Sequence, residues 1–290
     1  MHGYFYIFLA ALLWAMMGPL VQGALDAGVA AMEIAFWRAA IAGGLFVGHA
    51  LLLGRLKLDR KKDLVGIAGF GLVAVTLLFI SLHKTIEHGG ISLAIILLYS
   101  ASAFVVILAR VFLREALTPK KIAAVVMVIA GVSLVSLGGS SSGVEITVTS
   151  VSWGMVAALS YSSFYIIGKG FVARYRPVVL LAFLFPVGAI GLLPLADFTP
   201  KTTDAWAYIV LLAVASTYLS NLVYYTGLKQ IEASRAVLIA SLEPVMAAAL
   251  AAWLFGERLG PWGVVGAVLV VAASALTALT RARRRSRASE

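Results

Sequence analysis

The sequence predicts an all-α integral membrane protein with ten transmembrane helices, arranged as two inverted five-helix repeats around a central cavity. Three observations lead to this prediction: the composition is strongly apolar, the apolar residues form segments of membrane-spanning length, and one polar motif occurs twice. With 62% hydrophobic residues, 12% charged residues and a mean hydropathy of +1.00, the 290-residue chain has too little polar surface for a water-soluble globule.

Ten apolar segments account for most of the chain. Each is about 18 to 24 residues long, the length that a helix needs to cross a hydrocarbon core of about 30 Å. The first has no Lys or Arg before it and is long enough to span, so we interpret it as a transmembrane helix and not as a signal peptide. The segments are 4–23, 32–53, 64–83, 90–112, 120–138, 151–169, 177–196, 205–226, 233–255 and 262–280.

A polar motif at the end of the fourth segment recurs at the end of the ninth. Residues 113–119 read LREALTP and residues 255–261 read FGERLGP, so Glu115 and Glu257 lie 142 positions apart. Each copy connects the last two apolar segments of one half, where we expect its glutamate to cap or anchor that hairpin. The motif therefore indicates an internal duplication of five helices.

The duplication sets the arrangement of the two halves. Similarity extends without gaps over 92–137 and 234–279, where 12 of 46 positions are identical. Because each half has an odd number of helices, the halves are inverted, which is typical of alternating-access transporters with a site near mid-membrane. We divide the chain into a first five-helix repeat (1–138), an extracytoplasmic Gly/Ser linker (139–150), a second five-helix repeat (151–280) and a basic cytoplasmic tail (281–290).

Basic residues gather on one side of this topology. With a cytoplasmic N-terminus, 19 of the 23 Lys and Arg residues lie in inner loops and the tail, whereas Lys84, Lys201 and Arg258 lie outside and Arg38 lies within a helix. The positive-inside rule then places both termini in the cytoplasm, and we expect a multi-pass protein of the bacterial inner membrane. The net charge of +10 reports this topology and not nucleic-acid binding.

The composition argues against several kinds of chemistry. Cysteine is absent and only four histidines occur, so we expect no metal site and no cofactor. No His-Glu-x-x-His motif and no phosphate-binding loop of the form G-x4-G-K-[ST] is present, so neither an enzyme nor an ATP-driven pump is expected. A membrane receptor or scaffold is the alternative to a transporter.

Several of these residues resemble a known family. The two Glu-x-Leu corners, glycines in the last helix of each half (Gly131 and Gly266) and the FWR sequence at 36–38 resemble the drug/metabolite transporter (DMT) superfamily, and most closely its EamA family. The resemblance covers nearly the whole chain. It implies a ten-helix carrier of small polar metabolites, typically a bacterial exporter of amino acids or related compounds. The chain departs from the family pattern at Ser102 and His83, which leaves the substrate open.

Glu243 is the sharpest candidate for function. It lies about ten residues into the ninth segment and is followed by Pro244, which removes a backbone hydrogen bond and kinks a helix. A charged side chain near mid-membrane costs about 2.5–3.5 kcal/mol and needs a partner or a watery cavity. We expect Glu243 to bind a substrate ammonium group or to carry a coupling proton, and the alternative is a structural bond to a neighbouring helix.

Arg38 is the second charged candidate. It lies about six residues inside the second segment, and Glu33, five residues earlier, is poorly placed to pair with it on a helix. Its guanidinium group suits a substrate carboxylate. The alternative is that it reaches the outer headgroups or forms a structural pair.

Polar and aromatic side chains of other segments complete the candidate substrate site. Asn221 and Tyr225 share one face of the eighth segment, and inverted repeats bring equivalent positions of the fourth and ninth segments to the same centre. Ordinary helix packing, or an aromatic belt at the interface, is the alternative for each. Besides Glu243 and Arg38, the candidates are Asn221, Tyr99, Ser102, Trp14, Tyr161, Tyr165 and Tyr225.

His83 is a second candidate for proton coupling, because an imidazole gains and loses a proton near neutral pH. Lys84, Glu87 and His88 follow it closely, which instead indicates a polar cluster at the outer face.

The predicted function is secondary transport of a small polar metabolite by alternating access. An amino acid or a related zwitterionic or cationic compound, moved outward, is favoured because Arg38 is the one clear cavity cation, whereas a phosphorylated substrate needs several. A facilitator or antiporter of sugars, nucleosides or phosphorylated metabolites is the alternative. The expected partners are the metabolite and membrane lipid, and the chain is a monomer or a homodimer.

Overall fold

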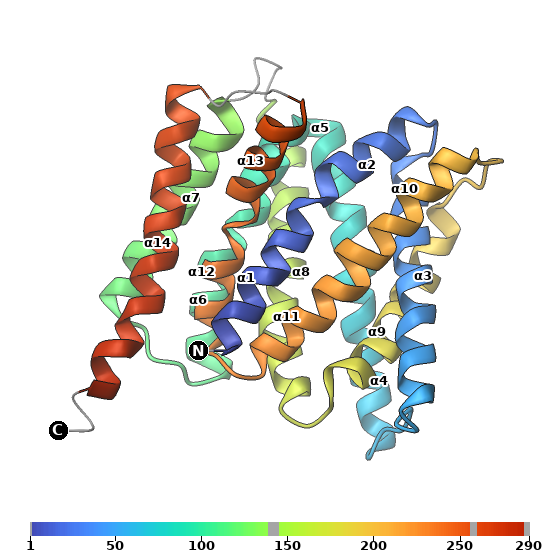
Figure 1. Ribbon diagram of the computed structural model, residues 1–290, viewed down its shortest axis with the longest axis horizontal. Helices are drawn as coiled ribbons and strands as arrows, with labels where there is room; N and C mark the ends of the chain where they lie inside the picture. Colours follow the sequence, from blue (N-terminus) through green and yellow to red (C-terminus); the bar gives the residue numbers. More distant parts are fainter. Residues whose placement is uncertain (1, 139–144, 256–259, 287–290) are drawn as a thin grey trace.

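The computed structural model describes residues 2–138, 145–255 and 260–286, and within these ranges the regular structure is entirely helical. Part of the predicted linker (139–144) and the second corner's Glu257 and Arg258 lie outside the described residues. The helices, shown in Figure 1, are α1 (His2–Ala15), α2 (Met17–Asp26), α3 (Ala31–Leu52), α4 (Lys61–Gly71), η1 (Leu72–Leu77), α5 (Leu78–Tyr99), α6 (Ala101–Phe112), α7 (Pro119–Gly138), α8 (Val148–Val172), α9 (Pro177–Leu192), η2 (Leu193–Leu195), α10 (Thr203–Ala213), η3 (Val214–Leu219), α11 (Ser220–Leu228), α12 (Ala233–Ala240), α13 (Glu243–Phe255) and α14 (Pro261–Ser286).

Eight helical runs among the described residues are long and apolar enough to cross a membrane. One of them, Lys61–Phe112, has 52 residues and would measure about 78 Å if straight, more than twice the hydrocarbon core. It covers two predicted segments and contains Gly90 at φ 81° and ψ 166°, a conformation essentially restricted to glycine. The chain therefore changes direction at Gly90. The last predicted segment corresponds to the shorter apolar helix Pro261–Thr277.

Two π-helical turns occupy equivalent positions of the duplicated sequence. Leu72–Leu77 forms η1 and Val214–Leu219 forms η3, 142 positions later. A π-turn widens the helix by one residue per turn and is frequent at functional sites. The fourth and ninth predicted segments are also interrupted at matching places, between α5 and α6 and between α12 and α13. The duplication thus extends to local irregularities that the hydropathy pattern does not reveal.

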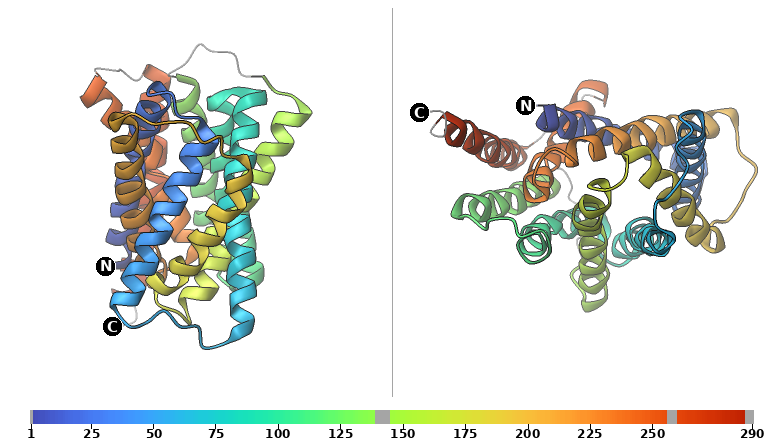
Figure 2. Two further views of the ribbon diagram at one scale, coloured as in Figure 1. Left: turned by 90° about the vertical axis from the view of Figure 1, so that its right-hand side faces the viewer. Right: turned by 90° about the horizontal axis from the view of Figure 1, so that it is seen from below.

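The helices pack mainly in long pairs. α14 packs along α7 at one edge of the molecule and α3 packs along α9 at the other, with α1, α8 and α11 between them (Figure 2). Gly131 of α7 and Gly266 of α14 allow close contact, since a Cβ atom at Gly131 would lie 2.7 Å from the Gly266 carbonyl oxygen. Small residues of this kind let membrane helices approach each other.

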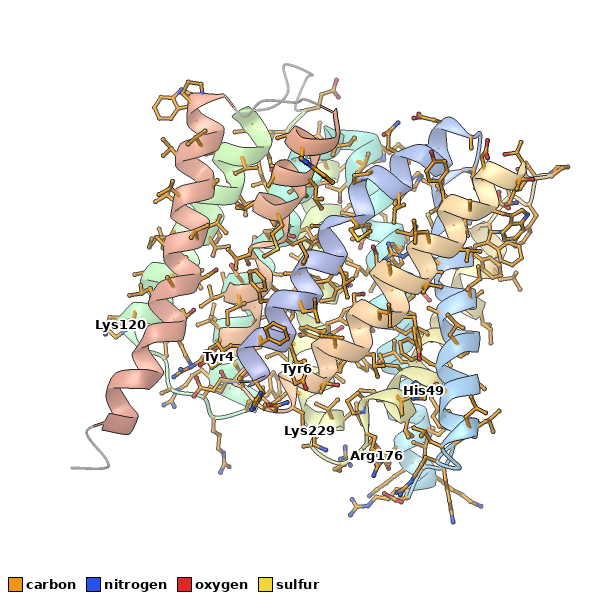
Figure 3. All side chains as sticks on the ribbon, viewed as in Figure 1. Tyr4, Tyr6, His49, Lys120, Arg176 and Lys229 are labelled. Atoms are coloured by element: carbon orange, nitrogen blue, oxygen red, sulfur yellow. The ribbon has the colours of Figure 1, made fainter. Side chains whose placement is uncertain are left out.

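Basic side chains lie at one end of the bundle. Figure 3 labels Lys120, Arg176 and Lys229 near the end of the bundle at which α1 begins and α14 ends. α14 continues to Ser286, so its helix extends into the first residues of the predicted basic tail (281–290). α8 likewise starts at Val148, three residues before the expected boundary, because Thr147 and Ser150 form a capping box there.

Candidate functional site

A cavity of about 110 Å³ lies between the central helices. Its charged and polar walls come from both halves of the chain, and the remainder is apolar or aromatic. It is lined by Trp14, Met17, Arg38, Ala39, Val75, Leu78, Phe79, Leu82, Leu98, Tyr161, Phe164, Phe185, Thr217, Asn221 and Glu243.

Arg38 forms one pole of the cavity. It projects from α3 and is only 6% exposed. Its Nε atom donates to the Thr217 hydroxyl at 3.1 Å, one terminal nitrogen contacts the Met17 sulfur at 2.8 Å, and its guanidinium carbon lies 5.1 Å from the centre of the Phe79 ring. Thr217 belongs to the π-turn η3 and donates to the Leu212 carbonyl at 3.2 Å. The π-turn therefore holds the hydroxyl that orients Arg38.

Glu243 forms the opposite pole. It is the first residue of α13, immediately after the interruption that follows α12, and Pro244 comes next, where a proline is tolerated near a helix start. Its side chain is half-buried because it borders the cavity. The Tyr99 hydroxyl lies close enough to hydrogen-bond its carboxylate.

The two poles are not paired with each other. Their charges are close enough to interact, yet no ion pair joins Arg38 and Glu243 within the described ranges. Asn221 adds an acceptor, because its Nδ2 donates to the Thr217 carbonyl at 2.7 Å while its Oδ1 is buried with no partner in the described part of the chain. Buried polar atoms are nearly always hydrogen-bonded, so an unpaired one marks a place for water or ligand. The cavity thus offers a cation at one pole and two acceptors elsewhere.

Aromatic side chains enclose the cavity beyond these poles. Trp14 of α1 packs on Tyr224 with ring centres 5.2 Å apart, and Tyr165 packs on Tyr224 at 5.5 Å. The Tyr165 hydroxyl donates to that of Tyr161 at 3.1 Å. Tyr225 is fully buried and donates to the Phe164 carbonyl at 3.3 Å. These rings form a continuous cluster of α1, α8 and α11 beside the cavity.

Comparison with known proteins identifies the family. The sequence profile of the EamA-like transporter family matches residues 1–137 and, separately, residues 148–279. The chain belongs to the EamA-like transporter family. An uncharacterized transporter of Archaeoglobus fulgidus is 30% identical over 249 residues, which are 83% of this chain and 86% of the relative. Uncharacterized transporter YxxF of Bacillus subtilis is 25% identical over 86% of this chain and 81% of its own length.

Two further matches concern substrate and fold. A probable terminal-alkyne amino-acid exporter of Streptantibioticus cattleyicolor is 27% identical over 97% of this chain and 95% of that protein. A solved crystal structure superposes with a TM-score of 0.84 over 97% of this chain and 98% of that chain, at 17% identity, which shows a shared fold. The protein is therefore a multi-pass membrane transporter of a small molecule.

The transporter brings together most of the residues that the sequence indicated. Glu243, Arg38, Asn221, Trp14 and Tyr161 all line the cavity. Three other predicted residues lie next to the cavity. Tyr99 faces Glu243, and Tyr165 and Tyr225 pack behind the lining in the aromatic cluster.

Two candidates lie outside the cavity lining of this EamA-like transporter. Ser102 is completely buried in α6, and its hydroxyl has no partner among the described residues. His83 is half-buried in α5, one position after the lining residue Leu82 and next to the Lys84–Glu87 ion pair. The structure does not bring either side chain to Arg38 or Glu243.

Sequence reasoning did not single out several lining residues of the transporter. Met17 and Phe164 are one helical turn from Trp14 and Tyr161, and the two lie 147 positions apart, as Trp14 and Tyr161 do. The same offset of 147 residues could therefore have identified Met17 and Phe164 as candidates from the sequence. The apolar residues of η1 and α5 carried no signal, since they look like ordinary membrane-facing residues.

The corner glutamate has a second role besides the one expected. Glu115 pairs with Lys121 of α7 and so anchors the α6–α7 hairpin. It also accepts from the backbone N–H of Ala233 at 2.7 Å and of Ser234 at 3.2 Å, and from the Ser234 hydroxyl. These donors are the first turn of α12, in the other half of the transporter. The Glu115 side chain is 9% exposed and lies 3.6 Å from Lys121, which lies 3.2 Å from Glu232. A helix N-terminus stabilises a negative charge, which explains this partner.

Proposed function

We propose that this EamA-like protein is a secondary transporter of amino acids that works by alternating access, with ten crossings in two inverted five-helix repeats. Support for the repeats comes from the two separate family matches, from the π-turns 142 positions apart, and from lining positions that are repeat equivalents. The proposed site lies between the halves, where each half can rock around it.

The observation that carries the proposal is the unpaired pair of opposite charges in one cavity. Arg38 matches an α-carboxylate, because a guanidinium forms two parallel hydrogen bonds to a carboxylate. Glu243 and the free Oδ1 of Asn221 match an α-ammonium group, which donates up to three hydrogen bonds. A zwitterion therefore neutralises both poles at once.

Other substrate classes fit these walls less well. A phosphate dianion needs several cationic donors, and Arg38 is the one cationic side chain in the described cavity lining. Of the two candidates for proton coupling, Glu243 lines the cavity and His83 does not, so the proposal keeps Glu243.

The proposed topology has both termini in the cytoplasm and the protein in a bacterial inner membrane. Support comes from the basic side chains at the end of the bundle where the chain begins. We propose export as the direction, and the relative from Streptantibioticus cattleyicolor, a probable amino-acid exporter, supports it.

Uptake into proteoliposomes of one amino acid and its two analogues tests the assignment of the poles. Leucine carries both charges, isoamylamine lacks the carboxylate and 4-methylpentanoate lacks the ammonium group. We expect leucine to be carried and both analogues to be carried at least about 10-fold more slowly, because each leaves one buried charge unpaired. An imposed pH gradient in parallel tests proton coupling.

The outcomes separate the classes. Arg38→Gln should remove the preference for leucine over isoamylamine, and Glu243→Gln should remove the preference over 4-methylpentanoate. Equal transport of all three compounds, or transport of sugars but of no amino acid, contradicts the proposal.

A further inference from the structure

Repeat-equivalent positions of the cavity carry opposite chemistry. Val75 corresponds to Thr217 and Phe79 to Asn221, each 142 positions apart. In both pairs, the first half supplies the apolar member and the second half the polar member. An ancestral symmetric cavity would show the same chemistry on both sides, so this difference divides the cavity into a polar part and an apolar part.

The apolar part is built by η1 and α5. All the residues that these two helices contribute to the lining are apolar: Val75, Leu78, Phe79, Leu82 and Leu98. None of their side chains has a hydrogen-bonding atom. This wall therefore cannot satisfy a polar group that is pressed against it.

The wall reaches both poles. Phe79 lies against the guanidinium group of Arg38, with 5.1 Å between the guanidinium carbon and the ring centre. At its other end, Leu98 precedes Tyr99, whose hydroxyl faces Glu243. A zwitterion held at the two poles therefore lies alongside this wall, and the wall is within reach of the side chain on its α-carbon.

We infer that η1 and α5 form a side-chain subsite that selects amino acids with apolar side chains, an inference that rests on the proposed amino-acid transport. Leu78, Leu82 and Leu98 are the residues that contact the substrate side chain. A hydroxyl or amide group there loses its water and gains no partner, so polar amino acids are disfavoured.

Competition between amino acids of nearly equal shape tests the inference. Valine with threonine, and leucine with asparagine, differ in polarity far more than in volume. In proteoliposomes containing the full-length protein, we expect kcat/KM for valine to exceed that for threonine by about 10- to 100-fold. The preference for leucine over asparagine should be larger, because an amide has more hydrogen-bonding groups to leave unsatisfied.

A matched pair of variants attributes the selectivity to the wall. Leu82→Asn puts an amide of similar size into the subsite, and we expect the leucine-to-asparagine ratio to fall by about 10-fold or more. Leu82→Met keeps the wall apolar at nearly the same volume and should leave the ratio within about 3-fold. Leu98→Asn makes the same change in the part of α5 that follows the turn at Gly90. This variant replaces Leu82→Asn in the test if Leu82→Asn does not fold.

The results distinguish this inference from the proposed function. Transport of all four amino acids without preference, or a ratio that neither Asn variant changes, overturns the subsite and leaves amino-acid transport standing. Transport of none of the four overturns the proposed function itself.

Discussion

The two glutamates at the two ends of α12 differ in how their charges are neutralised. At the start of the helix, Glu115 accepts from two backbone N–H groups and the Ser234 hydroxyl and lies beside Lys121. Beyond the end of the helix, Glu243 borders a cavity and has Tyr99 close by, with no ion pair among the described residues. One eight-residue helix thus separates a glutamate with an ion pair from a glutamate without one.

These surroundings indicate that Glu115 is the structural glutamate. A charge whose partners are all within the protein has nothing left for a ligand, and breaking such a set destabilises the fold. A charge that borders a cavity without an opposite charge paired to it is costly to keep, and persists where function requires it. Glu115 carries the more conspicuous motif, but Glu243 has the available chemistry.

The largest expected effect is on transport and concerns Glu243, the glutamate at the cavity. Glu243→Gln keeps the shape of the side chain and removes its charge. We expect leucine uptake to fall by about 10- to 100-fold, since a hydrogen bond to a charged group contributes about 1.5–3 kcal/mol. Thermal unfolding in detergent should stay close to wild type, because no described ion pair is lost. Unchanged uptake with unchanged pH dependence would contradict the role of Glu243.

The next effect is on stability and concerns the other end of α12. Glu115→Ala removes the cap of this helix and one partner of Lys121, so we expect the free energy of unfolding to fall by about 2 kcal/mol. Denaturant unfolding in mixed micelles measures it. Uptake per folded molecule should change little.

A matched control sharpens this result. Glu87→Ala breaks the Lys84–Glu87 pair, whose side chains are 41% and 47% exposed. Exposed pairs contribute little to stability because water and salt screen them, so this variant should be much closer to wild type. Equal losses from the two variants would show that Glu115 does not act as a buried cap.

The smallest effect is the pH dependence of the same cluster. Burial acts to raise the pKa of Glu232, but the hydrogen bond from Arg235 and the charges of Arg235 and Lys121 outweigh it and lower the pKa below the ordinary value. The stability that Glu232 contributes is therefore present above the ordinary glutamate pKa of about 4.3 and lost as the pH falls through the lower folded-state pKa. Because Glu232 is 40% exposed, we expect less than about 1 kcal/mol.

Unfolding in detergent at pH 7 and between pH 5 and pH 3 measures this contribution. Glu232→Gln should lower the stability slightly at pH 7 and should show a weaker loss in acid than wild type. Parallel loss in the two proteins would assign the acid sensitivity to other groups.

Much of the fold could be predicted from the sequence because membrane helices need long apolar runs with few charges. The predicted segments recur as helical runs. The sequence did not predict the two π-turns, although they lie at the 142-residue spacing of the motif. The interruption before Glu243 was anticipated from Pro244, since proline cannot continue the hydrogen-bond ladder of a helix. The direction of the Gly90 turn was not, because glycine permits many conformations.

The site was only partly predictable. A charge or an amide inside an apolar helix is conspicuous. Glu243, Arg38 and Asn221 could therefore be found from the free-energy cost of placing a polar side chain within the membrane. The partner of Arg38 could not, because Thr217 is 179 residues away and only packing brings the π-turn to α3. The apolar wall was equally hidden, since leucines that line a cavity do not differ in sequence from leucines that face lipid.

The sequence shows on its own that this chain is a membrane protein, that its two halves contain similar segments, and which few polar side chains lie within its apolar segments. These properties depend on local composition and spacing, because insertion into a membrane depends on the hydrophobicity of consecutive residues. The tertiary structure alone decided that Glu115 caps a helix of the other half, that Arg38 and Glu243 share one cavity without pairing, and that η1 and α5 give it an apolar wall. These properties are contacts between distant segments, which depend on how the helices pack.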